Sequence, residues 1–177
     1  MDSTSAKLKV AVFDRTVCVQ VSGRADFTCT VDLQKLITEL WERGYAHFMF
    51  DLRGCRMMDS TFLGVLTDIS LQLSNGAGGA GQSHPIELLN ANPRITETLE
   101  SLGVAQLFQI CDSAAPLSDK FEPLSQGAPA SPVELARTCL KAHQTLIALN
   151  PENAQRFKDV AQFMAEDLHR LEIGENR

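Results

Sequence analysis

The sequence predicts an α/β fold, with a mixed β-sheet flanked by helices and a C-terminal helical hairpin as an extension. Two alternating apolar runs open the chain, as in a β-hairpin. Short apolar runs then alternate with stretches of helical spacing, and two long helical stripes follow a proline-rich segment. The resulting order β-β-α-β-α-β-α-β, ahead of the two stripes, is typical of helices packed against a sheet.

The first elements form the predicted β-hairpin and a helix. Residues 8–13 alternate apolar and polar side chains, and Val17, Val19 and Val21 repeat this pattern after a short polar turn. We expect Ser22-Gly23 to end the second strand. Residues 27–43 then carry apolar side chains at helical spacing, and Gly44 is placed to stop that helix.

A buried strand and a second helix come next. Residues 47–52 form a short apolar run that suits a strand covered on both faces. We expect a loop over 53–58 and then a helix, with leucines at helical spacing from Leu63 to Leu73. Residues 76–81 are rich in glycine but lack the spacing of a phosphate-binding loop, so they predict a linker.

The last part of the α/β region repeats the pattern once more. Residues 86–89 predict a third buried strand, and Asn92-Pro93 begins a helix with proline in its first turn. Gly103 closes this helix, and residues 107–110 predict the final strand.

Composition divides the chain into three parts. Residues 1–112 hold the α/β pattern, and residues 113–132, with four prolines, read as a linker. Residues 133–172 predict a helical hairpin, since two stripes of apolar side chains are spaced three or four residues apart. The stripes are Leu135, Cys139, Ala142, Leu146 and Leu149, and then Phe157, Val160, Ala161, Met164, Leu168 and Leu171. Because two helices alone cannot bury both stripes, the hairpin must dock on the sheet domain, on a second copy as a homodimer, or on a partner.

Charge and hydropathy exclude some classes of function. The net charge of −6 and the absence of a basic run argue against nucleic acid as a partner. No apolar run approaches the roughly 18 residues of a membrane span. Because the first seven residues also lack the apolar core of a signal peptide, we expect a cytoplasmic protein that binds other proteins.

Cysteines and histidines give no sign of a catalytic or metal site. The five cysteines include no C-x-x-C pair, and we expect them to be small buried hydrophobes. The four histidines are far apart in sequence, and we expect each to lie at the surface or half-buried. We therefore expect no enzyme, no cofactor and no metal ion.

The segment Asp59-Ser60-Thr61 precedes an apolar helix. Asp59 or Ser60 is a natural helix N-cap, because a side-chain oxygen there accepts free backbone N–H groups. Asp26, ahead of the first predicted helix, has the same capping interpretation. On local sequence alone, capping is the ordinary interpretation of both sites.

Three motifs in order resemble the STAS domain family. Residues 58–66, Met-Asp-Ser-Thr-Phe-Leu-Gly-Val-Leu, are similar to the family's loop and helix start. Residues 23–26 resemble an earlier motif, in which a Gly and then an Asp follow the second strand. Residues 92–110, from Asn92-Pro93 through Leu102-Gly103-Val104, resemble the later one. The resemblance covers roughly residues 7–112 and points to anti-sigma-factor antagonists.

The resemblance implies a phosphorylation switch. Ser60 stands at the phosphoacceptor position, and Thr61 is either a second acceptor or a capping or buried hydroxyl. Asp26, Asp59, Phe62 and Gly64 fall on the implied partner surface. The implied partners are an anti-sigma factor that is a GHKL-type Ser/Thr kinase, bound by the unphosphorylated protein, and a PP2C-type phosphatase. The alternative is a STAS scaffold or subunit of a transporter or signalling assembly that works without phosphorylation.

Phe62 departs from the family pattern, which has glycine at this position. A glycine there lets a partner approach the helix start closely. The phenylalanine either tucks into the core or protrudes as an aromatic anchor for a partner.

Overall fold

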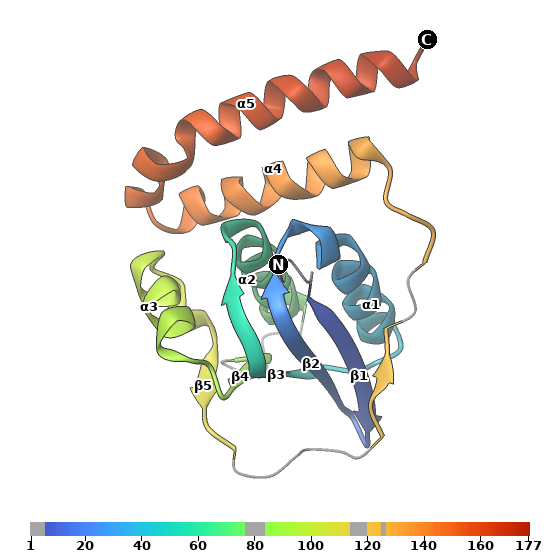
Figure 1. Cartoon of the computed structure of the whole chain (residues 1–177), viewed down its shortest axis with the longest axis vertical. Coiled ribbons are helices and arrows are strands. Elements are labelled where there is room, and N and C mark those ends of the chain that lie inside the picture. Colours follow the sequence, from blue (N-terminus) through green and yellow to red (C-terminus); the bar gives the residue numbers. More distant parts are fainter. Residues whose placement is uncertain (1–5, 77–83, 114–119, 125–126) are drawn as a thin grey trace.

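A computed structural model describes residues 6–76, 84–113, 120–124 and 127–177 (Figure 1). It contains a mixed sheet with strand order β5-β4-β3-β2-β1-β6. Strand β1 pairs antiparallel with β2 and β6, whereas β2, β3, β4 and β5 run parallel to one another. The strands are β1 Lys7–Phe13, β2 Thr16–Ala25, β3 His47–Met58, β4 Ile86–Leu89, β5 Gln109–Cys111 and β6 Glu122–Pro123. The predicted mixed α/β fold is thus confirmed.

Helices flank this sheet, and the core lies between the two. The helices of the α/β region are α1 Thr30–Glu42, α2 Ser60–Gly76 and α3 Pro93–Ser101, with short 3-10 helices η1 Phe27–Cys29 and η2 Ala105–Leu107. The largest fully buried side chains include Phe48 and Phe50 of β3 and Leu63 and Leu66 of α2. This packing fixes the start of α2 against the ends of the central strands.

Strands β2 and β3 are longer than the sequence predicts. The predicted end at Ser22-Gly23 and the predicted loop over 53–58 are both wrong, because Gly23 pairs with Cys55 and Ala25 with Met58. Register shifts let the pairing continue, as bulges do, and Cys55 and Met58 bury their side chains. Both strands therefore end at the same edge of the sheet.

The predicted helix boundaries agree well with the structure. Gly44 and Gly103 have φ of +97° and +71°, which is the left-handed conformation that ends helices at glycine. The Asn92 side chain caps α3 by accepting from Ile95 N at 3.0 Å, with proline following it. The final strand begins later than expected, because Leu107 lies in η2. Residues 77–81 of the predicted glycine-rich linker lie outside the described residues.

The segment expected as a linker is partly attached to the sheet. Strand β6 pairs with Val10 and Lys9 of β1, and Leu124 N donates to Leu8 O at 2.9 Å. The chain thus runs along the β1 edge of the sheet before it enters the C-terminal helices (Figure 1).

The C-terminal hairpin consists of α4 Pro132–Leu149 and α5 Glu152–Glu175. Helix α4 packs against both α2 and α5, so it lies between the α/β region and the outer helix (Figure 1). The structure therefore shows the first of the three docking alternatives. Leu149, expected on the buried stripe, is 37% exposed, and Asn153 is the single fully buried residue of α5. None of the helices in the described ranges is long and apolar enough to cross a membrane.

Asn153 attaches the hairpin turn to the α/β region. Its buried Nδ2 donates to Leu102 O and to Leu146 O, both at 2.9 Å. We expect Asn153→Ala to lower the free energy of unfolding by about 1–3 kcal/mol, because two buried hydrogen bonds are lost and the two carbonyls keep only their longer bonds from Asn150. Chemical denaturation measures the change, and Gln144→Ala, at an exposed α4 position, is the control. Equal stability of the two variants would contradict this role.

Candidate functional site

The site forms where β2 and β3 end side by side. Asp59, which follows β3, donates its N–H to Ala25 O at the end of β2, at 2.9 Å. Its Oδ2 accepts from Phe27 N of η1 at 3.2 Å. These bonds join the loop after β2 to the loop after β3, so Asp26 and Asp59 are brought to one place.

Asp59 also caps α2. Its Oδ1 accepts from Phe62 N at 2.8 Å, and its carbonyl accepts from Leu63 N at 3.1 Å. The capping interpretation therefore holds for Asp59, whose carboxylate oxygens both bind backbone N–H groups. It leaves the Ser60 hydroxyl, on the first residue of α2, free of the cap.

Asp26, which follows β2, is also a helix cap. Its side chain accepts from Thr28 N at 3.0 Å and so caps η1. Half-buried, it also lies close enough to Asp59 to disfavour the second negative charge. Two carboxylates consequently stand beside the Ser60 position.

Burial raises the pKa of the Asp59 carboxyl above its ordinary value of 3.8. Hydrogen bonds from Phe62 and Phe27 and the nearby His143 oppose this shift, whereas Asp26 adds to it. In the folded state the carboxyl thus holds its proton to higher pH than in the unfolded chain.

This shift predicts a pH dependence of stability. The contribution of Asp59 is fully present below its unfolded pKa, near 3.8, and is lost as the pH rises through the raised folded pKa. We expect the free energy of unfolding of the parent, relative to Asp59→Asn, to decrease with rising pH in that window. Denaturant unfolding of both proteins at a series of pH values measures the difference. A difference that stays constant or grows with pH would contradict the assignment.

The Ser60 hydroxyl contacts the C-terminal hairpin. Its Oγ lies 3.0 Å from Nε2 of His143, which α4 supplies and which is 2% exposed. His143 Nδ1 lies 2.8 Å from Cys139 O, a carbonyl that can only accept, so Nδ1 carries a proton. In the neutral ring Nε2 then accepts the hydrogen bond from Ser60 Oγ.

The His143 ring is held from both sides. Phe157 of α5 packs edge-on against it, with ring centroids 5.2 Å apart and planes at 71°.

A serine and a histidine in contact also form the nucleophile and base of many hydrolases. In this chain the hydroxyl is half-buried and faces the covering helix.

Gly64 marks the closest approach of α4 to α2. A Cβ atom at Gly64 would lie 2.6 Å from Ala142 O and 2.7 Å from Ala142 Cβ, too close for a real contact. Gly64 and Ala142 are both buried. The backbones of the two helices therefore touch one turn after Ser60.

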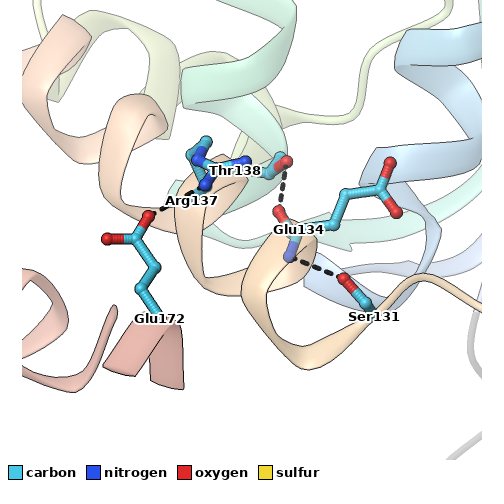
Figure 2. Close-up of polar contacts among 5 residues, drawn as sticks. All are labelled: Ser131, Glu134, Arg137, Thr138 and Glu172. Atoms are coloured by element: carbon cyan, nitrogen blue, oxygen red, sulfur yellow. Dashed lines mark hydrogen bonds and ion pairs between the residues drawn. The ribbon is translucent and has the colours of Figure 1, made fainter. Parts of the chain in front are cut away.

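Around this contact the interface becomes polar. Three ion pairs link α4 to its neighbours: Lys35–Glu134 at 3.0 Å, Lys141–Asp68 at 3.0 Å and Arg137–Glu172 at 2.8 Å. Figure 2 shows Arg137 and Glu172 together with the Ser131 cap, whose Oγ accepts from Glu134 N at 3.1 Å. A cleft of about 140 Å³ opens beside Val65, between α2 and α4.

The structure brings the predicted site residues together but exposes few of them. Phe62 is 0% exposed, which is the core alternative rather than the aromatic anchor. Thr61 is 6% exposed, as expected of a buried hydroxyl. An exposed aromatic side chain does stand at the site: Phe27, in η1 beside Asp59, is 44% exposed. The sequence does not predict this exposure, because Phe27 belongs to the segment 27–43 that was expected to form one helix with an apolar face.

Cysteines and histidines follow the expectation in part. Cys18, Cys29 and Cys55 are buried as predicted, and burial raises the pKa of Cys18 and of Cys29 to about 12. Cys111 and Cys139 are only partly buried. The prediction that His143 lies at the surface or half-buried is wrong, since this side chain is buried at the site. Within the described ranges, no three His, Cys, Asp or Glu side chains gather as a metal site would require.

Comparisons with solved structures find the same fold in bacterial regulators. A candidate anti-sigma factor antagonist of Thermotoga maritima, TM1081, superposes with a TM-score of 0.52 at 18% identity, over 60% of this chain and 87% of its own. The unphosphorylated anti-sigma factor antagonist SpoIIAA gives 0.50 at 18% identity, over 60% and 88%. An anti-sigma factor antagonist of Mycobacterium paratuberculosis gives 0.50 at 17% identity, over 62% and 87%. A comparison with curated proteins returns no match.

The family model of the STAS domain matches residues 7–116. That match covers more than half of the 177 residues and includes Asp26, Asp59 and Ser60. Helices α4 and α5 lie beyond it. The chain therefore belongs to the STAS domain family.

Proposed function

We propose that this protein is an anti-sigma-factor antagonist switched by phosphorylation of Ser60. In this proposal the unphosphorylated protein binds an anti-sigma factor that is a GHKL-type Ser/Thr kinase, and so regulates transcription. Phosphorylation of Ser60 releases the kinase, and a PP2C-type phosphatase restores the bound state. The protein acts as the kinase's substrate and not as an enzyme.

The observation that carries this proposal is the position of the Ser60 hydroxyl. Ser60 is the first residue of α2, and Asp59 caps that helix, so the Ser60 side chain has no structural task in the cap. The family match includes this segment, and the structural neighbours are described as antagonists of anti-sigma factors. Modification of this hydroxyl would therefore leave the cap of α2 in place.

The physical effect of a phosphate at Ser60 suits a switch. The group adds about −1.5 to −2 charges and three acceptor oxygens. At the start of a helix the free N–H groups and the dipole favour such an anion, so α2 itself tolerates it. The nearby carboxylates of Asp26 and Asp59 already make this surface negative, and a partner that fits the neutral hydroxyl would be repelled.

Phosphorylation mapping tests the proposal. The purified chain is incubated with ATP and each GHKL-type Ser/Thr kinase of the source organism, and the products are analysed by mass spectrometry. We expect one phosphate, on Ser60, that is lost in Ser60→Ala and retained in Ser101→Ala, a control at an exposed serine of α3. Equal labelling of Ser60→Ala and the parent would show that Ser60 is not the acceptor.

One observation favours the alternative of a scaffold that works without phosphorylation. The Ser60 hydroxyl is already bonded to His143 and covered by α4. In that case the STAS domain would be a subunit of a transporter or signalling assembly. Affinity purification from native cells distinguishes the scaffold from the phosphorylation switch. A scaffold would be recovered with an ABC-type ATPase, whereas the switch would be recovered with a kinase.

Self-association through the hairpin stays a prediction. Val160, Phe163 and Ile173 of α5 are large apolar side chains that remain exposed. Light scattering at micromolar concentration distinguishes a homodimer from a monomer.

A further inference from the structure

We infer that the C-terminal hairpin is an intramolecular ligand of the STAS domain's own partner surface, and that a phosphate on Ser60 releases it. The inference rests on the proposed role of Ser60 as the phosphoacceptor. It adds the element that moves: α4 occupies the start of α2 in the unphosphorylated protein and leaves it after phosphorylation.

The first argument is the place where α4 docks. Ala142 and His143, adjacent in α4, contact Gly64 and Ser60, which are one turn apart in α2. Thr61 also faces α4, because its hydroxyl contacts the Cys139 thiol. The covering helix therefore contacts the residues of α2 that a partner approaching the phosphoacceptor would have to reach.

The second argument is the lack of room for a phosphate. Ser60 Oγ and His143 Nε2 are in direct hydrogen-bond contact at 3.0 Å, so a phosphoryl group on Oγ needs the space that the imidazole fills. Helix α4 cannot shift slightly toward α2 to accommodate it, since the Gly64 and Ala142 backbones already touch. Phe157 closes the other side of the His143 ring. A phosphate on Ser60 Oγ in this side-chain orientation would therefore move α4 outward.

Electrostatics point in the same direction. A phosphate on Ser60 would add negative charge next to the carboxylates of Asp26 and Asp59. The α4 cations nearest in sequence to His143 are engaged elsewhere, Lys141 with Asp68 and Arg137 with Glu172. The closed arrangement thus gains repulsion between the phosphate and the two carboxylates, and among the groups in contact with Ser60 only a protonated His143 ring would oppose it.

The hairpin is also built to separate. Four side chains of α4 are buried, and the rest of its interface with α1 and α2 includes an exposed ion pair, a partly buried ion pair and a small open cleft. Interfaces within one chain that are this polar allow relative motion by default. The fully buried side chains of the STAS core, such as Phe48, Phe50 and Leu63, come from the sheet and from α2, and α4 adds only Ala142 and Leu146 to that core cluster.

Cys139 reports the position of α4 without any kinase. Its thiol is partly buried in the interface, and burial raises its pKa, so it reacts slowly with a thiol reagent while α4 is docked. Cys111→Ser removes the other partly exposed thiol and leaves three buried ones. In this background, phosphoserine is incorporated at position 60 during synthesis, and the rate of reaction with Ellman's reagent is measured.

We expect the Ser60-phosphorylated chain to react between about 5-fold and 150-fold faster than the unphosphorylated one, the usual range of coupling between two sites. Phosphoserine at position 101, exposed on α3, is the matched control and should leave the rate unchanged. Ala142→Glu, which places a charge against Gly64, should raise the rate without any phosphate. Hydrogen exchange of residues 60–66 in the same samples should increase in parallel.

The inference is wrong if the Ser60-phosphorylated chain keeps both the slow Cys139 reaction and the slow exchange of residues 60–66. That result would leave the proposed function standing, because a kinase could still label Ser60. Conversely, release of α4 by the installed phosphate, with no kinase able to label Ser60, would support the coupling and contradict the proposed function.

Discussion

Replacing Phe62 with alanine is expected to lower the free energy of unfolding by about 3–5 kcal/mol, as for other buried phenylalanines. Phe62 is 0% exposed and belongs to the core cluster that includes Leu63 and Leu66 of the same helix. Its removal leaves a cavity that the sheet and α2 can fill only by moving the site. Urea denaturation of the parent and the variant measures the loss.

Phe163→Ala provides the control for this prediction. Phe163 lies on α5 and is 64% exposed, so its truncation should change stability by no more than about 0.5 kcal/mol. Similar losses in the two variants would contradict the assignment of Phe62 to the core. A Phe62→Ala protein of unchanged stability would instead favour the aromatic anchor at a partner surface.

Replacing Gly64 with valine is expected to displace α4 from α2. The new Cβ would lie 2.6 Å from Ala142 O and 2.8 Å from Ala142 C, and backbone atoms cannot turn aside as a long side chain can. Overpacking of this kind costs about 1–3 kcal/mol, and release of the hairpin avoids it. Hydrogen exchange measures the loss of protection at residues 60–66 and at the α4 face that covers them.

Gly174→Ala is the matched control, since it alters a helical glycine of α5 with nothing within 4 Å of the added Cβ. It should leave hairpin docking intact and, in an exposed helix, stabilise the protein by up to about 1 kcal/mol. If Gly64→Val kept the exchange protection of the parent, the close approach of the two helices would not be a feature of the protein in solution.

Local chemistry explains why much of the fold could be predicted from the sequence. Alternation in residues 8–13 and helical spacing in residues 27–43 are short-range patterns, and each belongs to one kind of element. Glycines at 44 and 103 end helices for a reason that resides in the residue itself. Strand ends were harder, because the pairing of Gly23 with Cys55 depends on register across the sheet.

The site was predictable only on its STAS side. Asp26, Asp59 and Ser60 lie next to element boundaries, where capping and the family motif both draw attention to them. His143 is 83 positions away from Ser60, and a helical stripe shows which face is apolar but not what it covers. Ala142 was on the predicted stripe, yet its contact with Gly64 follows from tertiary packing. The exposure of Phe27 likewise could not be predicted, because the residue begins a segment with an apolar pattern.

The central claim is that α4 and a protein partner compete for the surface around Ser60. The most direct test uses the proposed partner, a GHKL-type kinase that labels Ser60, and measures its affinity for Ala142→Glu and for Gln144→Glu, which adds the same charge at an exposed α4 position. Neither substitution alters the STAS domain, and calorimetric titration measures both. If α4 masks the surface, Ala142→Glu should bind between about 5-fold and 150-fold more tightly than the parent, with Gln144→Glu unchanged. Equal affinities for all three proteins would contradict the claim.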